Sequence, residues 1–191
     1  NYFENFVYSQ SDFSFPITDR VLSTLRKKGY DGPSTVLPLG VDTSEFNDRD
    51  YISRKEICAD SDDVLIGYVG RIEESKGLST LLDALKHIHK ENYELLLIGS
   101  GPYEKHLLEK ARSLGVKERI THLGYIDHSD ISSYISALDV LVLPSETQSD
   151  WKEQFGRVII EALACRTPVV GSDSGEIPYL IRDTEGGVVF P

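Results

Sequence analysis

The stretch VLIGYVGRIEESKGLSTLLDAL, residues 64–85, joins a short apolar run to a helical pattern, and it decides the fold class. Its first part, 64–70, is apolar almost throughout, which is typical of a strand buried on both faces of a sheet. The leucines that follow recur with helical spacing and predict an amphipathic helix over 76–90. The stretch is therefore one strand–loop–helix unit.

The same alternation continues along the rest of the chain. Further strands are predicted at 93–99, 120–125, 140–145, 168–173 and 186–190. Helices are predicted at 102–114, 156–165 and 176–182, with one more that Ser129 and Asp130 cap. This alternation predicts right-handed βαβ units in an α/β fold with a doubly wound parallel sheet, Rossmann-like in type. Ligands bind outside the carboxyl ends of such strands, so the loops after 70, 99, 125, 145 and 173 are the expected sites.

Residues 1–60 follow a different pattern. They predict a short strand, a helix that begins at Thr18 and a second strand over 34–40, followed by a polar, Asp-rich arm. We therefore divide the chain into a tail and linker, 1–60, and a Rossmann-like domain, 61–191. Because the sequence begins with asparagine and contains no methionine, we expect a piece of a larger protein.

The composition excludes several classes of protein. A net charge of −11 argues against a nucleic-acid partner, because binding to phosphates needs a basic face. No apolar run approaches the roughly 18 residues that a membrane span needs, and no signal peptide is visible. Cys58 and Cys165 lie far apart without ligand-like histidines, so we expect two free thiols.

The loop after the first strand, GRIEESKGL, carries two cations, Arg71 and Lys76, just before a helix. Helix amides and the helix dipole add to such charges and form an anion site. The loop alone is equally consistent with two solvated basic residues. In a chain with a net charge of −11, however, their position at the ligand edge favours the anion site.

Three other patterns are weighed and rejected as functional sites. The stretch 97–105 begins like a dinucleotide fingerprint, but Glu104 replaces the third glycine, so a tight turn is favoured over an NAD site. The acidic runs at 48–50 and 60–63 lie in the polar arm or just before the first strand, so we expect no metal. The five histidines show no triad or ligand spacing, so we predict no catalytic histidine.

The segment EQFGRVIIEALA, residues 153–164, places two carboxylates around the start of a helix. Glu161 lies among apolar neighbours, where an ionised carboxylate is costly unless something satisfies it. The amides of 156–158 point out of the helix N-terminus and form a second anion site, with Glu153 in the loop just before it. We therefore expect Glu161 to accept two hydroxyls of a sugar or ribose.

Taken in order, the motifs GVDTSEF, GRIEESKG, GSGP, EQFGRVIIEALA and TPVVGSDSGEIPYLI resemble a known family. This is the C-terminal domain of retaining glycosyltransferases of family 4, the "group 1" family with the GT-B fold, and the resemblance covers nearly the whole chain. The family's paired glutamates are matched by Glu153 and Glu161. The resemblance implies two Rossmann-like domains that face each other across a cleft. This chain would supply the nucleotide-sugar donor site, and an absent N-terminal domain would bind an acceptor glycan or lipid-linked sugar.

The resemblance also implies roles for individual residues. Arg71 and Lys76 would grip the donor diphosphate and Glu161 the ribose hydroxyls, while Glu153 would meet the donor sugar. Glu153, Arg71 and Lys76 are the implied catalytic residues, without metal or cofactor, for glycosyl transfer that retains the anomeric configuration. The implied donor-binding residues are Arg71, Lys76, Tyr125, Ile126, Gln154, Phe155, Gly156, Arg157 and Glu161, with Tyr125 and Ile126 against the nucleobase.

The chain departs from the family pattern at three places. The loop at 146–152 is longer than usual, and we expect it to cover the sugar or to contact a partner. Gln154 and Arg166 each replace a common glycine. The motifs look most like those of bacterial exopolysaccharide enzymes, and we expect the full-length enzyme to be cytoplasmic or peripheral at the inner face of the membrane.

Two alternatives remain open from the sequence. One is a nucleotide- or sugar-binding Rossmann module without transferase activity, which Arg71, Lys76 and Glu161 would serve equally well. Glu153 is the residue that discriminates between the two. The other is a GT-B sugar-nucleotide epimerase, which needs acid and base residues that we do not find.

Overall fold

The structure, a computed structural model, describes every residue except 1, 48–51, 58–62 and 89–91. It divides into two compact units, Asn1–Gly40 and Val41–Pro191, so the boundary precedes the predicted one at residue 60. The segment after Gly40 belongs to the second unit for a physical reason. Phe46 is buried, and the hydroxyl of Ser136 donates to the carbonyl of Asn47 at 2.8 Å.

A six-stranded parallel sheet forms the centre of the second unit, with the strand order β3-β2-β1-β4-β5-β6. The strands are β1 (Val64–Val69), β2 (Tyr93–Ile98), β3 (Ile120–Gly124), β4 (Val140–Leu143), β5 (Val169–Ser172) and β6 (Gly187–Phe190). All six predicted strands are present, and the predicted doubly wound α/β fold is confirmed. The order reverses between β1 and β4, which makes their carboxyl ends the switch point of the sheet.

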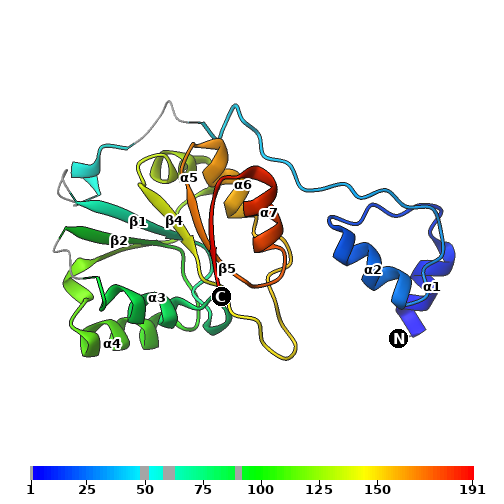
Figure 1. Cartoon of the computed structure of the whole chain (residues 1–191), viewed down its shortest axis with the longest axis horizontal. Helices are drawn as coiled ribbons and strands as arrows, with labels where there is room; N and C mark the ends of the chain where they lie inside the picture. Colours follow the sequence, from blue (N-terminus) through cyan, green and yellow to red (C-terminus); the bar gives the residue numbers. More distant parts are fainter. Residues whose placement is uncertain (1, 48–51, 58–62, 89–91) are drawn as a thin grey trace. The chain divides into compact units, whose positions relative to one another are not determined.

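The helices of the second unit cover both faces of the sheet. They are α3 (Leu78–Leu85), α4 (Glu104–Leu114), α5 (His128–Ile135), α6 (Arg157–Ala164) and α7 (Ile177–Thr184). In Figure 1, α3 and α4 lie on one face and α5, α6 and α7 on the other. Right-handed crossovers require this arrangement, because the chain moves outward from β1 to β3 and then returns past β1 to β4.

The core of this unit is built from the apolar strands that the sequence predicts. Leu65, Tyr68, Leu95, Leu96, Leu141 and Val169 are all essentially inaccessible to solvent. They come from four neighbouring strands, so the centre of the sheet is covered from both sides. A parallel sheet buried in this way holds the ends of its strands in fixed positions, which is what a site on its edge needs.

The loop between β1 and α3 differs from the prediction. A 3-10 turn, Glu74–Lys76, precedes α3, and the helix is shorter than the predicted 76–90, of which 89 and 90 lie outside the described residues. Gly77 separates turn from helix with φ +65, and a Cβ there would lie 1.8 Å from the carbonyl oxygen of Pro144. The loop after β1 is therefore packed directly against the end of β4.

Two local predictions were wrong. Ser129 and Asp130 do not cap α5, because the helix already begins at His128 after an extended Asp127. The expected strands of the first unit shrink to one isolated parallel bridge, Ser14 with Ser34, among its described residues. Three backbone hydrogen bonds join the two segments around this bridge, and Pro16, which has no amide hydrogen to donate, interrupts the ladder.

Two helices lie among the described residues of the first unit, and one of them was not predicted. α1 (Tyr2–Gln10) was not anticipated, whereas α2 (Asp19–Lys27) begins as expected. The hydroxyl of Thr18 accepts a hydrogen bond from the amide of Val21 at 3.1 Å and caps α2.

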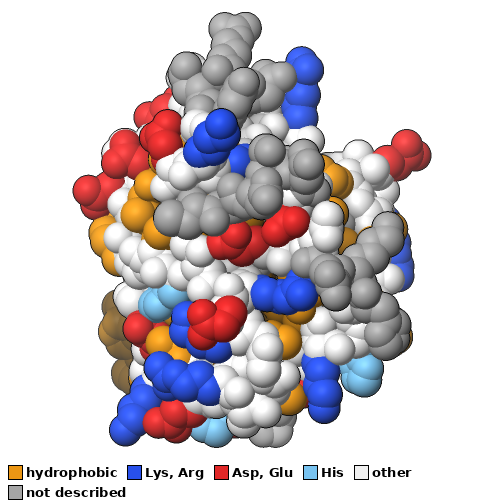
Figure 2. Space-filling model, turned by 90° about the vertical axis from the view of Figure 1, so that its left-hand side faces the viewer, with side chains coloured by type: hydrophobic (Ala, Val, Ile, Leu, Met, Phe, Trp, Pro, Cys, Tyr) orange, Lys and Arg blue, Asp and Glu red, His pale blue; other side chains and the backbone are white. Residues whose placement is uncertain are grey.

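The surface carries charges of both signs (Figure 2), and Cys165 is the cysteine that the described residues include. On the side of the molecule in Figure 2, acidic and basic side chains are interspersed. None of the described helices is both long and apolar enough to span a bilayer. Cys165 is buried, and its thiol lies 3.8 Å from the carbonyl oxygen of Ser132, while Cys58 and most of the acidic runs at 48–50 and 60–63 lie outside the described residues.

The contact at Gly77 generates a stability prediction. Gly77→Ala is expected to lower the free energy of unfolding by about 2–4 kcal/mol, because it combines a left-handed backbone with a clash against a backbone carbonyl. Gly115→Ala is the matched control: Gly115 also has a left-handed φ of +73, but a Cβ there meets nothing within 4 Å. Urea unfolding should give a loss of only about 1 kcal/mol for the control. Equal losses of unfolding free energy in the two variants would show that the contact with Pro144 does not contribute to stability.

Candidate functional site

A pocket of about 170 Å³ opens where β1 and β4 end, at the switch point of the sheet. It is lined by residues from the end of β1, the loop after it, the end of β4 and the start of α6: Tyr68, Val69, Gly70, Arg71, Lys76, Leu143, Glu153, Gly156, Arg157 and Val158. Five of the ten are residues that the sequence predicts as site residues. The structure thus brings together positions that lie more than eighty residues apart in the chain.

An ion pair spans this pocket. The ammonium of Lys76 donates to Glu153 Oε2 at 2.8 Å, and the two side chains are 17% and 12% exposed. The hydroxyl of Ser145 donates to the same oxygen at 3.0 Å. The backbone of Glu153 is held as well, because its carbonyl oxygen accepts a hydrogen bond from the amide of Glu176 at 3.2 Å. The Glu153 carboxylate is therefore fixed from several sides at the mouth of the β4–α6 loop.

Arg71 lines the same pocket but, unlike Lys76, is mostly exposed to solvent. Its side chain is 77% exposed, and its guanidinium pairs with the carboxylate of Glu73 two residues later. Its backbone carbonyl accepts a hydrogen bond from the buried hydroxyl of Tyr68 at 2.7 Å. Burial, with a further contribution from Glu153, raises the pKa of that hydroxyl, so Tyr68 stays protonated and donates. The backbone at Arg71 is thus anchored, while its side chain is exposed and pairs with Glu73 at the mouth of the pocket.

The start of α6 forms the opposite wall of the pocket. Gly156 precedes the helix with φ +78 and has no side chain that could cap the first amides. Arg157 occupies the first helical position, where the helix dipole disfavours a cation. This is an arrangement that a helix does not adopt for its own stability. It is suited to an anion that approaches both the amides and the guanidinium.

Glu161 lies one turn further along α6 and is 5% exposed. Arg157 Nε donates to its Oε1 at 2.9 Å, which gives the buried carboxylate a partner. Burial raises the pKa of Glu161, and the positive charges of Arg157 and of nearby His128 lower it by less. Arg157 is therefore the partner that satisfies the carboxylate of Glu161 on an otherwise apolar helix. A search of the sequence for opposite charges four residues apart on a helix would have found this pair.

The remaining predicted residues do not line the pocket. Phe155 is buried beneath the loop, and Gln154 is exposed. Tyr125 is 73% exposed and Ile126 half-buried, in the loop after β3. None of these four lines the pocket that contains Lys76. The pocket instead includes Tyr68 and Val69, which were predicted only as part of a strand.

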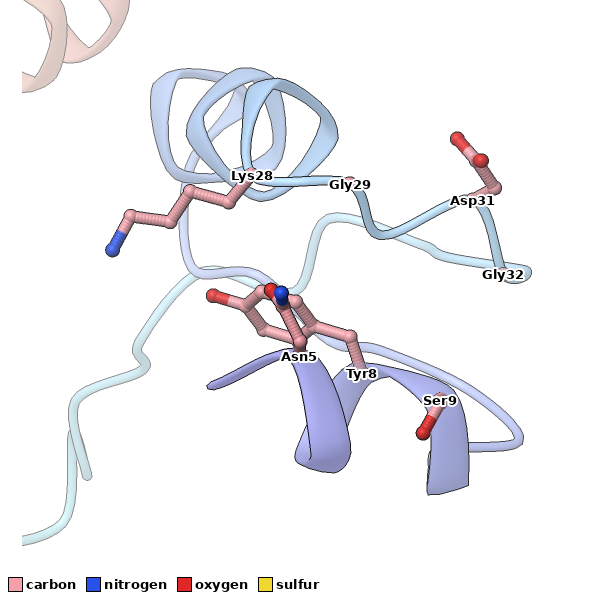
Figure 3. Close-up of a pocket in the computed structure, with 7 residues that line it drawn as sticks. All are labelled: Asn5, Tyr8, Ser9, Lys28, Gly29, Asp31 and Gly32. Carbon is pink, nitrogen blue, oxygen red and sulfur yellow. The ribbon is translucent and has the colours of Figure 1, made fainter. Parts of the chain in front are cut away.

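A second pocket, of about 430 Å³, lies wholly in the first unit. It is lined by residues of α1 and of the turn after α2, drawn in Figure 3: Asn5, Tyr8, Ser9, Lys28, Gly29, Asp31 and Gly32. Lys28 is already paired with Glu4 at 2.6 Å, and the Asp31 carboxylate points away from the Lys28 ammonium. Its polar groups do not converge, so the pocket between β1 and β4 is the candidate site.

Metal ions need several ligands close together. Among the described residues, no group of three or more His, Cys, Asp or Glu side chains could hold a metal ion. His122 bonds to the carbonyl of Gly99, and His128 lies beside Arg157. The prediction of a metal-free site stays a prediction, for which a binding assay is given below.

Comparison with known proteins agrees with this geometry. The family described as "Glycosyl transferases group 1" matches residues 51–191, which include every residue of the pocket. The chain belongs to this family. The sheet, the switch-point pocket and the paired glutamates of this chain therefore all fall within the matched region.

Relatives and solved structures support the assignment. A GDP-mannose-dependent alpha-(1-6)-phosphatidylinositol monomannoside mannosyltransferase of Mycolicibacterium smegmatis is 32% identical over 167 residues, 83% of this chain and 44% of that protein. Sucrose-phosphate synthase from Thermosynechococcus elongatus matches with 29% identity and a TM-score of 0.81, over 98% of this chain and 47% of the other. Anabaena HepE in complex with UDP and glucose has the same fold, with 23% identity and a TM-score of 0.82, over 97% of this chain and 51% of that one. The chain thus spans about half the length of these proteins, and its fold is that of GT-B glycosyltransferases.

The burial of Glu161 predicts how stability depends on pH. A carboxyl whose pKa is raised on folding stabilises the fold fully below its unfolded value, 4.5, and that stabilisation is lost as the pH rises through the higher folded value. The Glu161→Gln variant cannot ionise, so it should gain stability relative to the wild type as the pH rises above about 4.5.

Urea unfolding of both proteins between pH 4 and pH 7 measures this difference. The expected result is that the stability of the glutamine variant, measured relative to the wild type, rises across this range. If the variant instead becomes relatively less stable with rising pH, the ion pair with Arg157 outweighs burial and the assigned direction is wrong.

Proposed function

We propose that this chain provides the donor site of a retaining glycosyltransferase, which transfers a hexosyl or other glycosyl group from a nucleotide-diphosphate sugar to an acceptor hydroxyl. One observation carries the proposal. Lys76 and Glu153 meet at 2.8 Å across a pocket at the switch point of the sheet, within the region that matches a glycosyltransferase family. The relative from M. smegmatis, which is GDP-mannose-dependent, supports a nucleotide sugar as the donor.

The cations of the pocket suit a diphosphate leaving group. When the bond from the anomeric carbon to the diphosphate breaks, negative charge develops on the leaving oxygen. Fixed cations and helix amides aimed at that charge are a large source of rate enhancement. Lys76, Arg71 and Arg157 line the pocket together with the start of α6, so the chain provides this stabilisation without a metal.

The two glutamates take different parts in the proposal. Glu153, held at the pocket by Ser145, positions the donor sugar, and the acceptor hydroxyl adds on the face from which the diphosphate leaves. Glu161 binds the ribose hydroxyls from α6. Tyr125 and Ile126, in the loop after β3, face the nucleobase, with Gln154, Phe155 and Gly156 beside the sugar. The acceptor, a glycan or lipid-linked sugar, is bound mainly by an N-terminal domain.

Calorimetric titration with UDP-, GDP-, ADP- and CDP-sugars, the free diphosphates and the nucleosides tests this function. We expect one nucleotide to be preferred and the sugar to change the affinity, as a transferase requires. Equal affinity for a nucleotide with and without its sugar would instead support a nucleotide-binding module without transferase activity.

The same titration predicts independence from divalent metal. Because three cationic side chains line the pocket, the affinity for the preferred diphosphate should be unchanged when a chelator is added. Titrations with and without EDTA, at constant ionic strength, give the comparison. Loss of binding in the chelator, restored by added Mg²⁺ or Mn²⁺, would refute the metal-free site.

Substitution of the cations gives a further prediction. Lys76→Ala and Arg71→Ala are each expected to weaken diphosphate binding by about 1.5–3 kcal/mol, the scale of a hydrogen bond to a charged group. Binding of the nucleoside without phosphate should be nearly unchanged. Lys105→Ala, which removes an exposed cation of α4, is the matched control and should bind like the wild type. If diphosphate and nucleoside binding fall equally, the cations do not contact phosphate.

A further inference from the structure

Trp151 lies in the long loop between β4 and α6, next to the pocket but not among the residues that line it. The loop is fastened to both of its neighbours. The amide of Glu146 donates to the carbonyl of Ser75 at 2.9 Å, and the hydroxyls of Thr147 and Ser174 lie 3.0 Å apart. A further bond from the Gln148 amide to the Trp151 carbonyl, at 2.7 Å, closes the loop on itself. The indole is therefore carried by an ordered segment.

The ring of Trp151 faces the lysine of the pocket. The ammonium of Lys76 lies over the indole at 4.8 Å from the ring centroid, within the distance at which a cation and an aromatic face attract each other. The same ammonium pairs with Glu153 at 2.8 Å. Lys76 is thus held between a carboxylate and an aromatic face, and it is only 17% exposed.

This arrangement has consequences for how the lysine can act. A lysine side chain is long and flexible, and an ammonium without fixed partners samples many positions. Glu153 takes one of the three N–H donors of Lys76, whereas the indole face offers no oxygen that would compete with a ligand. The ring therefore restrains the charge while it leaves donors for phosphate oxygens.

We propose that Trp151 is a positioning residue of the donor site, which holds the Lys76 ammonium in place for the diphosphate; this role rests on the proposed function. Trp151 does not contact the reacting atoms. It acts through Lys76, and its effect is on the phosphate part of the ligand. A ring that instead stacked on the donor sugar would act on the sugar part, and the two roles separate by experiment.

The chain contains a single tryptophan, so its fluorescence reports on this contact alone. Without ligand, Lys76→Met should shift or intensify the emission relative to the wild type, because the charge over the ring is lost. Lys105→Met, on α4, is the control and should leave the emission unchanged. UDP, GDP and ADP are then titrated into the wild type, and the diphosphate that binds should change the emission while its nucleoside does not.

Two substitutions of Trp151 distinguish the effect of its aromatic face on diphosphate binding from the effect of its size. Trp151→Leu is expected to weaken binding of the diphosphate about two- to thirtyfold, the range that a cation–aromatic contact spans. Trp151→Phe keeps an aromatic face and should retain most of the affinity. Nucleoside binding should be unchanged in both. Tyr179→Leu removes a half-exposed aromatic ring of α7 and is the matched control, with wild-type affinity expected. Far-ultraviolet circular dichroism and urea unfolding establish that each variant is folded.

Several results would overturn the proposal. These are an unchanged diphosphate affinity in Trp151→Leu, equal losses in the leucine and phenylalanine variants, and a loss confined to nucleotide sugars, which would make Trp151 a sugar contact. If the wild type binds no diphosphate at all, the proposed function fails and the positioning role fails with it. The ligand-free comparison of Lys76→Met with the wild type would then still show whether the lysine lies on the ring, so the two failures are distinguishable.

Discussion

The ion pair between Lys76 and Glu153 joins the two loops on which the site is built. One follows β1 and the other follows β4, and these strands are neighbours only because the sheet reverses its order between them. With both side chains mostly buried, desolvation cancels much of their attraction, so the pair contributes more to position than to stability. Removing either partner would leave the other charge mostly buried without its counterion, so the sequences of the two loops depend on each other. Gly77, which lets the first loop approach the backbone at Pro144, makes the pair geometrically possible.

The sheet was predictable because its strands are short, nearly continuous apolar runs in the sequence. Runs such as 64–70 and 93–99 are apolar on both faces, and no other element of that length suits them. The ends of the helices were less predictable. α3 begins only after Gly77 because a left-handed residue cannot continue a 3-10 turn into a helix, and a periodic pattern does not record that. The segment 34–40 has the composition of a strand, but a strand also needs a neighbour to pair with, which the sequence of one segment does not specify.

The site was predictable where it depends on strand ends and unpredictable where it depends on the paths of loops. Arg71 and Lys76 follow β1 directly, and Gly156 begins α6, so topology alone brings them to one edge. Tyr68 was predicted only as part of the strand 64–70, yet its hydroxyl anchors the backbone at Arg71. The contact between Trp151 and the lysine depends on how the β4–α6 loop folds back, and neither hydrophobic periodicity nor charge spacing encodes that path.

Glu153 and Glu161 are the same residue type eight positions apart, yet their surroundings give them different tasks. Glu161 is fixed within α6, burial raises its pKa, and its partner Arg157 stands one turn away on the same helix. Its environment is local, so a neutral amide of the same shape fits without disturbing other elements. Glu153 lies in a loop, and its partner comes from the other side of the switch point. Neutralising Glu153 would therefore loosen two loops at once and release the lysine from its carboxylate. A change at Glu161 reports on what the carboxylate binds, whereas a change at Glu153 reports on how the whole site is assembled.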